Sequence, residues 1–304
     1  MDKKICIITG ANSGIGKAAA SQIVLEGYHV ILACRNQERG EKALQEILAE
    51  TGSNSVDLMI VDMSLQSSIQ AFSTAFLTKY ETLNVLIHNA AAFDITNKKP
   101  IFTSEGVESI WATNHLGPVL LTNLLMEGIK RSDQGRIITI SSKGLIVYPF
   151  LRVDLEDPEF RQRKFSVSKA YYQSKLAQVM YTYWLANELR DTPNTVNCIR
   201  VANVKIDINS RYPNTSKISK FMYSIKSRSS ISPEEMAETY TYLATSEDMK
   251  ETSGKYFDDP AHIVSSSKYS MSKENIDAVM ELTMNYFQKT QVDNNGETGG
   301  EMGL

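Results

Sequence analysis

The chain has few of the residues that build disulfide frameworks and metal sites. Its 304 residues include only three cysteines and four histidines. Cys6, Cys34 and Cys198 lack the spacing of metal ligands, and each lies in or beside an apolar segment. We therefore interpret them as reduced thiols of the core. The histidines form no ligand pair, so we predict no metal site.

Long apolar runs and an excess of positive charge are also missing. No segment is apolar over the ~20 residues that a transmembrane helix needs. The N-terminus leads directly into an apolar strand-like segment, without the longer apolar region of a signal peptide. The net charge of −3 argues against a dedicated nucleic-acid-binding protein. We expect a soluble, cytoplasmic protein that does not bind nucleic acid.

The composition is that of an ordinary globular protein, with 42% hydrophobic and 22% charged residues. Neither a linker rich in proline and glycine nor an internal repeat divides the chain. We expect one domain over residues 1–290. Residues 291–304 are polar and glycine-rich, and we expect them to be a disordered tail.

A glycine-rich turn near the N-terminus is the most informative segment. Thr9-Gly-Ala-Asn-Ser-Gly-Ile-Gly16 follows the apolar run 5–8, and it precedes a helix-like segment, 17–26, and a second apolar run, 30–33. This order predicts the strand, turn, helix and strand of a nucleotide-binding βαβ unit. The glycines allow the backbone to approach a pyrophosphate, and the N-terminus of the helix offers N–H groups to the anion.

Apolar runs and amphipathic segments continue to alternate along the chain. This alternation predicts a Rossmann-type α/β fold, with a doubly wound parallel sheet and helices on both faces. The further strands are expected at 56–61, 85–87, 136–140, 195–201 and 255–257, and the further helices around 44–48, 69–76, 103–129, 168–190 and 234–245.

Two stretches interrupt the alternation. Residues 144–167 are typical of a surface excursion. Residues 211–230 carry apolar side chains at the spacing of an amphipathic helix, namely Ile218, Phe221, Met222 and Ile225. This helix would either close over a lipophilic substrate or simply pack against the core.

Tyr171 and Lys175 are four residues apart on an expected helix, so their side chains share one face. An ammonium group beside a phenol favours the phenolate and lowers its pKa toward the range of a general acid/base. A chance pair on a solvated helix would look the same in isolation. Ser142, however, ends the strand 136–140, at the edge where parallel sheets bind ligands, and Asn114 lies within the long helix before that strand.

Together these motifs resemble the short-chain dehydrogenase/reductase family over about residues 5–260. The glycine-rich turn looks like the cofactor loop of the family, and His88-Asn-Ala-Ala91 resembles its Asn-Asn-Ala-Gly motif. Asn114, Ser142, Tyr171 and Lys175 resemble its catalytic tetrad. Further segments are similar to the branch of retinol dehydrogenases and WW-domain oxidoreductases, namely 33–35, 114–117, 171–177 and 253–257.

The resemblance implies an oxidoreductase acting on a lipophilic aldehyde, ketone or alcohol. Tyr171 would protonate the carbonyl oxygen, or deprotonate the alcohol in reverse, and Ser142 would hydrogen-bond the same oxygen. Lys175 would hold the nicotinamide ribose and lower the pKa of Tyr171, and Asn114 would position a water molecule. A homodimer or homotetramer through the long helices is also implied.

The residues implied for cofactor binding extend from the glycine-rich turn to the sixth strand. They are Gly10, Asn12, Ser13, Gly14, Ile15, Gly16, Arg35, Asp62, Met63, Asn89, Ala90, Ala91, Tyr171, Lys175 and Val204. Asp62 resembles the family residue that meets the adenine ring, although it would also suit a helix N-cap.

The choice of cofactor can be argued from charge. An enzyme that prefers NAD usually has a carboxylate at the end of the second strand, where this chain has Ala33-Cys34-Arg35-Asn36. Arg35 can pair with a 2′-phosphate, although an ordinary solvated arginine would fit the same position. We predict that NADP(H) is preferred and that NAD(H) is possible.

The segment after the strand 195–201 departs from the family pattern. It lacks the usual Pro-Gly pair, and Ile206 stands where the family has a threonine. The backbone of Val204 can still bind a carboxamide, but the threonine hydroxyl is missing. The alternative interpretation is therefore a cofactor-binding regulatory or scaffold protein with weak or no turnover. The intact tetrad favours the enzyme.

Overall fold

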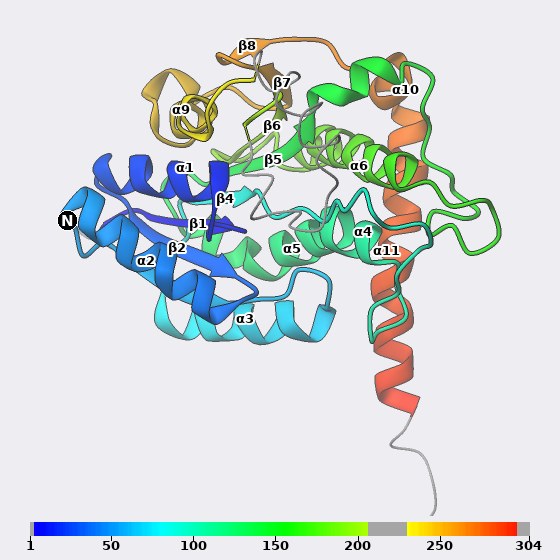
Figure 1. The fold of residues 1–304 in the computed structure, drawn as a ribbon, viewed down its shortest axis with the longest axis horizontal. Helices are drawn as coiled ribbons and strands as arrows, with labels where there is room; N and C mark the ends of the chain where they lie inside the picture. The colour runs from blue at the N-terminus through cyan, green and yellow to red at the C-terminus, as the bar shows by residue number, and fades with distance from the viewer. Residues whose placement is uncertain (1–2, 206–229, 297–304) are drawn as a thin grey trace, which may run out of the picture.

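An eight-stranded sheet forms the centre of the computed structural model, which describes residues 3–205 and 230–296 (Figure 1). Its order is β3-β2-β1-β4-β5-β6-β7-β8. The strands are β1 (Ile5–Thr9), β2 (His29–Cys34), β3 (Val56–Ile60), β4 (Val85–His88), β5 (Arg136–Ser142), β6 (Thr195–Val201), β7 (Lys255–Asp258) and β8 (His262–Ile263). Neighbouring strands are parallel except β7 and β8, which pair antiparallel. The predicted doubly wound α/β fold is confirmed.

Helices cover both faces of the sheet. α1 (Gly14–Leu25), α2 (Gln37–Thr51) and α9 (Pro233–Thr245) pack on one face, and α3 (Gln66–Lys79), α5 (Gly117–Lys130) and α6 (Val167–Glu188) on the other. Figure 1 shows α1 and α9 on the side opposite α3 and α5. Along β2, Leu32 packs with the first set of helices and Ile31 with the second, and both are fully buried. The strands therefore read as unbroken apolar runs.

The long helix expected at 103–129 begins later. Residues 102–108 form a turn instead, in which Gly106 has a φ of +78° and Phe102 bridges Glu108. The buried carboxylate of Glu108 then accepts hydrogen bonds from the backbone of Ile110 and Trp111 and starts α4 (Ser109–Trp111). A π-helical turn, η1 (Ala112–Leu116), continues directly into α5.

The C-terminal part contains two helices that the sequence analysis does not predict, α10 (Lys268–Met271) and α11 (Lys273–Gly296). Ile276, Val279 and Met280 are buried against the main core, and this spacing was a usable helical signal. α11 continues to Gly296, so the predicted domain boundary at residue 290 falls inside a helix. The amphipathic segment 211–230 lies, apart from Ser230, outside the described residues.

Cys6, Cys34 and Cys198 are free and buried, as predicted. Among the helices of the described residues, none is long and apolar enough to cross a membrane.

Gly117, the first residue of α5, sits where no larger residue fits. A Cβ at this position would lie 2.2 Å from the carbonyl oxygen of Met63, a backbone atom that cannot swing away. In the same helix, a Cβ at Gly128 would lie 3.2 Å from the flexible end of Leu77.

We predict that Gly117→Ala lowers the free energy of unfolding by roughly 1–3 kcal/mol, and that Gly128→Ala leaves it nearly unchanged. Urea unfolding of both variants checks this, and equal effects would contradict it.

Candidate active site

The carboxyl ends of six neighbouring strands bring most of the predicted site residues to one edge of the sheet. The glycine-rich turn follows β1, Arg35 follows β2, Asp62 and Met63 follow β3, and Asn89 to Ala91 follow β4, while Ser142 ends β5 and Val204 follows β6. The order of the strands reverses between β1 and β4, which are hydrogen-bonded neighbours. Parallel sheets of this kind bind ligands at such a reversal.

The glycine-rich turn is held against the end of β4 at short range. Gly10 has a φ of +67°, and a Cβ on it would lie 2.9 Å from the Cα of Ala90. The hydroxyl of Thr9 accepts a hydrogen bond from the N–H of Ala90 (3.0 Å) and donates one to the carbonyl of Ile87 (3.3 Å). Position 10 therefore requires glycine for two reasons: a Cβ would clash with Ala90, and the φ angle is positive.

Asn89 joins the turn to the rest of the site. Its side-chain amide donates to the carbonyls of Thr9 (2.9 Å) and Gly10 (3.2 Å), and its Oδ1 accepts from the hydroxyl of Tyr240 (3.4 Å). A Cβ on Gly16 would lie 2.4 Å from the amide nitrogen of Asn89. The third glycine thus leaves the space that this amide occupies.

The N-terminus of α1 is open to an anion. The N-cap residue, Ser13, makes no side-chain capping bond, whereas Asn36, Ser166 and Ser232 cap α2, α6 and α9 through their side chains. Ser13 and Gly14 are exposed. The first N–H groups of α1 can therefore donate to a phosphate, with the helix dipole in support.

Arg35 and Asp62 form the outer end of the site. The Arg35 side chain is 76% exposed, and its guanidinium lies 3.8 Å from the Asp62 carboxylate. Asp62 also accepts hydrogen bonds from the backbone N–H (2.9 Å) and hydroxyl (2.7 Å) of Ser64. These bonds close the turn after β3, in which Met63 is buried.

Lys175 is buried at the other end of the site, with a relative exposure of 2%. Its ammonium group donates to the carbonyl of Ile140 (2.9 Å) and lies 5.7 Å from the centre of the Tyr171 ring. Burial lowers the pKa of Lys175 to about 8. The Tyr171 ring is half-buried and packs against Phe93, with ring centres 4.3 Å apart. The predicted neighbourhood of Tyr171 and Lys175 is present.

Asn114 lies in the π-helical turn, a geometry often found at functional sites. Its Oδ1 accepts from the N–H of Ala92 (2.6 Å), and its Nδ2 donates to the carbonyl of Ala92 (3.0 Å) and the hydroxyl of Ser174 (3.0 Å). The Ser174 hydroxyl donates in turn to the carbonyl of Tyr171 (2.7 Å). Asn114 thereby connects the segment after β4 to the helix of Tyr171.

The two serines at the end of β5 have different partners. Ser141 is buried, donates to the carbonyl of Lys175 (3.1 Å) and accepts from the hydroxyl of Tyr256 (3.4 Å). Ser142 is half-buried, and its hydroxyl accepts from the N–H of Gly144 (3.2 Å). Ser142 can still donate its own proton to a substrate oxygen.

His88 replaces an asparagine of the family motif and is a neutral core residue. Its Nε2 lies 2.7 Å from the hydroxyl of Thr122. Burial and, to a smaller extent, the charge of Lys175 lower the pKa of His88 to about 3. His88 therefore contributes no charge to the site at neutral pH.

The segment after β6 is fixed through its backbone. Lys205 donates to the carbonyl of Ile231 (2.9 Å), and Ile231 donates to that of Asn203 (3.1 Å). Neither bond uses the N–H or C=O of Val204, which lies between them. Ile206 is outside the described residues.

The structure adds three supporting residues to those predicted. Ser174 stands beside Lys175 in the sequence, and this position was the only signal for it. Ala92 contributes two backbone groups, and Tyr240 reaches Asn89 from α9, more than a hundred residues away along the chain. Backbone groups and distant contacts of this kind leave no local sequence pattern.

The sequence is similar to those of known oxidoreductases. A family model described as short chain dehydrogenase matches residues 4–151. Human retinol dehydrogenase 13 is 35% identical over 263 residues, covering 84% of this chain and 76% of its own length. Mouse retinol dehydrogenase 14 is 35% identical over 270 residues, covering 85% and 78%.

Solved structures share the fold. A protein of Mycobacterium paratuberculosis superposes with a TM-score of 0.71 at 25% identity, covering 93% of this chain and 92% of its own. L-sorbose reductase of Gluconobacter frateurii, solved with NADPH and L-sorbose, has a TM-score of 0.67 at 21% identity, covering 87% and 98%.

The fold and the relatives together define an oxidoreductase of the dehydrogenase/reductase class. The chain belongs to the short-chain dehydrogenase/reductase family, in its retinol dehydrogenase-like branch.

The burial of Lys175 predicts a pH-dependent stability. Because its pKa falls from 10.5 in the unfolded chain to about 8 in the folded protein, the folded state binds fewer protons above pH 8. The free energy of unfolding contributed by this group therefore rises with pH, by roughly 1 kcal/mol between pH 8 and 9. From about pH 7 downward the group is protonated in both states, and the penalty of the buried charge is constant.

Urea unfolding of the cofactor-free protein at pH 7.5–9 measures this effect as the difference between wild type and Lys175→Met. The comparison is needed because burial raises the pKa of all three cysteines, that of Cys34 and Cys198 to about 11, which acts in the opposite direction from about pH 8 upward. Lys42→Met, at an exposed lysine, is the control and should keep the wild-type slope. Identical slopes for wild type and Lys175→Met would contradict the prediction.

Proposed function

We propose that the protein is an NADP(H)-dependent oxidoreductase that interconverts a lipophilic aldehyde or ketone and the corresponding alcohol, with Tyr171 as general acid/base. The observation that carries this proposal is the buried ammonium of Lys175, 5.7 Å from the centre of the Tyr171 ring. A buried cation close to a phenol stabilises the phenolate and so supports proton transfer near neutral pH.

The residues at the sheet edge fit a dinucleotide. Gly10 and Gly16 lack the Cβ atoms that would collide with Ala90 and Asn89, so the turn lies flat against β4 and leaves the N-terminus of α1 accessible. The N–H groups of residues 13–16, together with the side chain of Asn12, would hold the pyrophosphate. Asp62 and Met63 would contact the adenine, and Asn89 to Ala91 the adjoining ribose.

Proton transfer would be divided among the tetrad. When bound, the nicotinamide supplies or accepts the hydride. Tyr171 gives its phenolic proton to the carbonyl oxygen, or takes the proton of the alcohol in reverse. Ser142 donates a hydrogen bond to the same oxygen as charge develops on it. Lys175 would hold the ribose hydroxyls. Asn114 keeps its π-helical turn in place beside Ala92 and Ser174 and would position a water molecule for proton supply.

Two observations support a lipophilic substrate. Phe93 packs on the Tyr171 ring and gives the surroundings of the acid an aromatic surface. The relatives from human and mouse are named for retinol, which is an apolar alcohol. A substrate of this kind would bind mainly through apolar contacts.

A regulatory protein that binds the cofactor but turns over poorly is the second candidate. It is favoured by the missing Pro-Gly pair and by Ile206 in place of a threonine. Against it, the backbone around Val204 is fixed by its bonds to Ile231, so a carboxamide contact would not need the threonine. Activity measurements separate the two candidates.

We predict that the protein oxidises NADPH with retinal or another apolar aldehyde or ketone as substrate. Tyr171→Phe should lower kcat by about 10²–10⁴-fold, since it removes the transferable proton. Tyr172→Phe is the matched control. The Tyr172 ring contacts the rings of both Tyr148 and Tyr171, and phenylalanine keeps these contacts and removes only the hydroxyl, so kcat should stay within a few-fold. The decrease in NADPH absorbance measures both.

The outcomes distinguish the candidates. Turnover that Tyr171→Phe loses and Tyr172→Phe keeps supports the proposed reaction. Turnover that survives Tyr171→Phe contradicts the role of Tyr171. NADPH binding by calorimetry with no turnover across the panel favours the regulatory candidate.

Arg35 is the proposed determinant of cofactor choice. It is exposed beside the site, and its partner Asp62 is 3.8 Å away, so its guanidinium can still reach a 2′-phosphate. We predict that Arg35→Gln raises the Kd for NADPH about tenfold or more and leaves the Kd for NADH nearly unchanged. Arg39→Gln, an exposed arginine in the first turn of α2, is the control. An equal change in Kd for NADPH and NADH would show that Arg35 does not bind the 2′-phosphate.

A further inference from the structure

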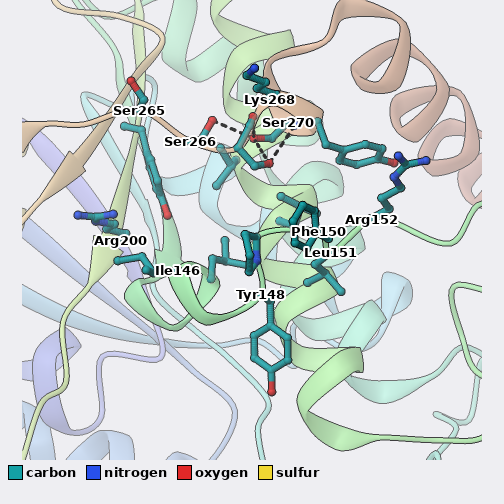
Figure 2. Close-up of a pocket in the computed structure, with 17 residues that line it drawn as sticks. Ile146, Tyr148, Phe150, Leu151, Arg152, Arg200, Ser265, Ser266, Lys268 and Ser270 are labelled. Atoms are coloured by element: carbon teal, nitrogen blue, oxygen red, sulfur yellow. Dashed lines mark hydrogen bonds between the residues drawn. The ribbon is translucent and has the colours of Figure 1, made fainter.

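A cavity of about 490 Å³ lies next to the candidate active site, between the segment after β5, helix α6 and residues 265–270 (Figure 2). None of Asn114, Ser142, Tyr171 and Lys175 lines it. Its volume is within the roughly 300–1,000 Å³ of small-molecule sites. The cavity is therefore large enough for a ligand of its own.

The walls of the cavity are mostly apolar and aromatic. Leu176 and Val179 of α6 form one side, and Leu145 and Leu151 of the segment after β5 form another. Tyr256 of β7 contributes an aromatic ring. In Figure 2 the serines 265, 266 and 270 lie with Lys268 on one side of the cavity, and Ile146, Tyr148 and Leu151 on the other. The cavity thus has an apolar part and a polar part.

The charged side chains that line the cavity are all positive. They are Arg152, Arg200 and Lys268, and no aspartate or glutamate is among the lining residues. Arg200 is paired with Asp258 at 2.6 Å. Within the part of the chain that the structure describes, Arg152 and Lys268 have no carboxylate partner, and Arg152 lies over the ring of Tyr269, 5.8 Å from its centre. Two positive charges are therefore left to pair with a ligand.

Apolar side chains at the rim are exposed to a degree that a bound ligand would reduce. Phe150 is 92% exposed and Ile146 is 55% exposed, and both line the cavity. A large apolar side chain that is almost fully in water forgoes most of the stabilisation that burial would supply. Contact with a hydrocarbon chain would recover part of it.

We propose that this cavity is a binding site for a long-chain carboxylate of the fatty-acid type, separate from the site of hydride transfer. The hydrocarbon chain packs among Leu145, Leu151 and Leu176, and the positive charges of Arg152 and Lys268 attract the carboxylate. Because the ligand joins an apolar chain to a single negative charge, it matches both parts of the cavity. The proposal does not depend on the reaction assigned to Tyr171.

The test uses cis-parinaric acid, whose fluorescence rises in an apolar environment, titrated into the full-length protein. The neutral analogue, cis-parinaryl alcohol, is titrated in parallel. We expect the acid to bind about tenfold more tightly than the alcohol. Arg152→Gln and Lys268→Gln should each lower the affinity for the acid roughly threefold to tenfold without changing the affinity for the alcohol. Lys42→Gln should change neither affinity.

A cavity-filling variant locates the bound probe. Leu151→Trp, in the half-buried rim segment, should abolish probe binding while NADPH binding and the melting temperature remain at wild-type values. Val179→Phe, at another residue that lines the cavity, is a second cavity-filling variant and is used if Leu151→Trp does not fold. Equal affinity for acid and alcohol, an absence of binding, or full binding in a folded cavity-filled variant would overturn the proposal.

Discussion

The close contact between the first and fourth strands organises this molecule. β1 and β4 pair where the strand order reverses. The turn after β1 lies so close to the end of β4 that a Cβ at Gly10 would clash with the Cα of Ala90. Thr9 and Asn89 close the gap with four hydrogen bonds between the turn and the end of β4. None of these bonds uses an N–H group at the start of α1, so those groups can donate to an anion.

The second constraint is the burial of a cation next to a phenol. The ammonium of Lys175 donates a hydrogen bond to the carbonyl of Ile140 and lies next to the ring of Tyr171. Burial lowers the pKa of Lys175 to about 8. Asn114, Ala92 and Ser174 connect the segment after β4 with the helix of these two residues. The two halves of the site are thereby linked through the buried side chains of Asn114 and Ser174 and the backbone of Ala92, so their relative position does not depend on exposed side chains.

The differences from the sequence prediction have physical causes. The helix expected from Thr103 begins at Ser109, because a left-handed Gly106 and the carboxylate of Glu108 favour a turn followed by a cap over a longer helix. α11 was missed although Ile276, Val279 and Met280 carry a helical spacing. Its polar side and the following glycine-rich residues resemble a tail, and its burial depends on a contact with α6 and η1, such as the one between Thr283 and His115.

The sequence by itself determined the alternation of strands and helices, the glycine-rich turn and the spacing of Tyr171 and Lys175, because each of these is a local pattern of residue types. The positions of Asn114, Ser142 and the residues proposed to bind the cofactor were predicted from the resemblance of single segments to motifs of the family. Only the tertiary structure decided which distant groups meet: Tyr240 with Asn89, Asn114 with Ala92 and Ser174, and the basic side chains around the cavity. These contacts join segments far apart in the chain, and the packing that creates them has no periodicity in the sequence.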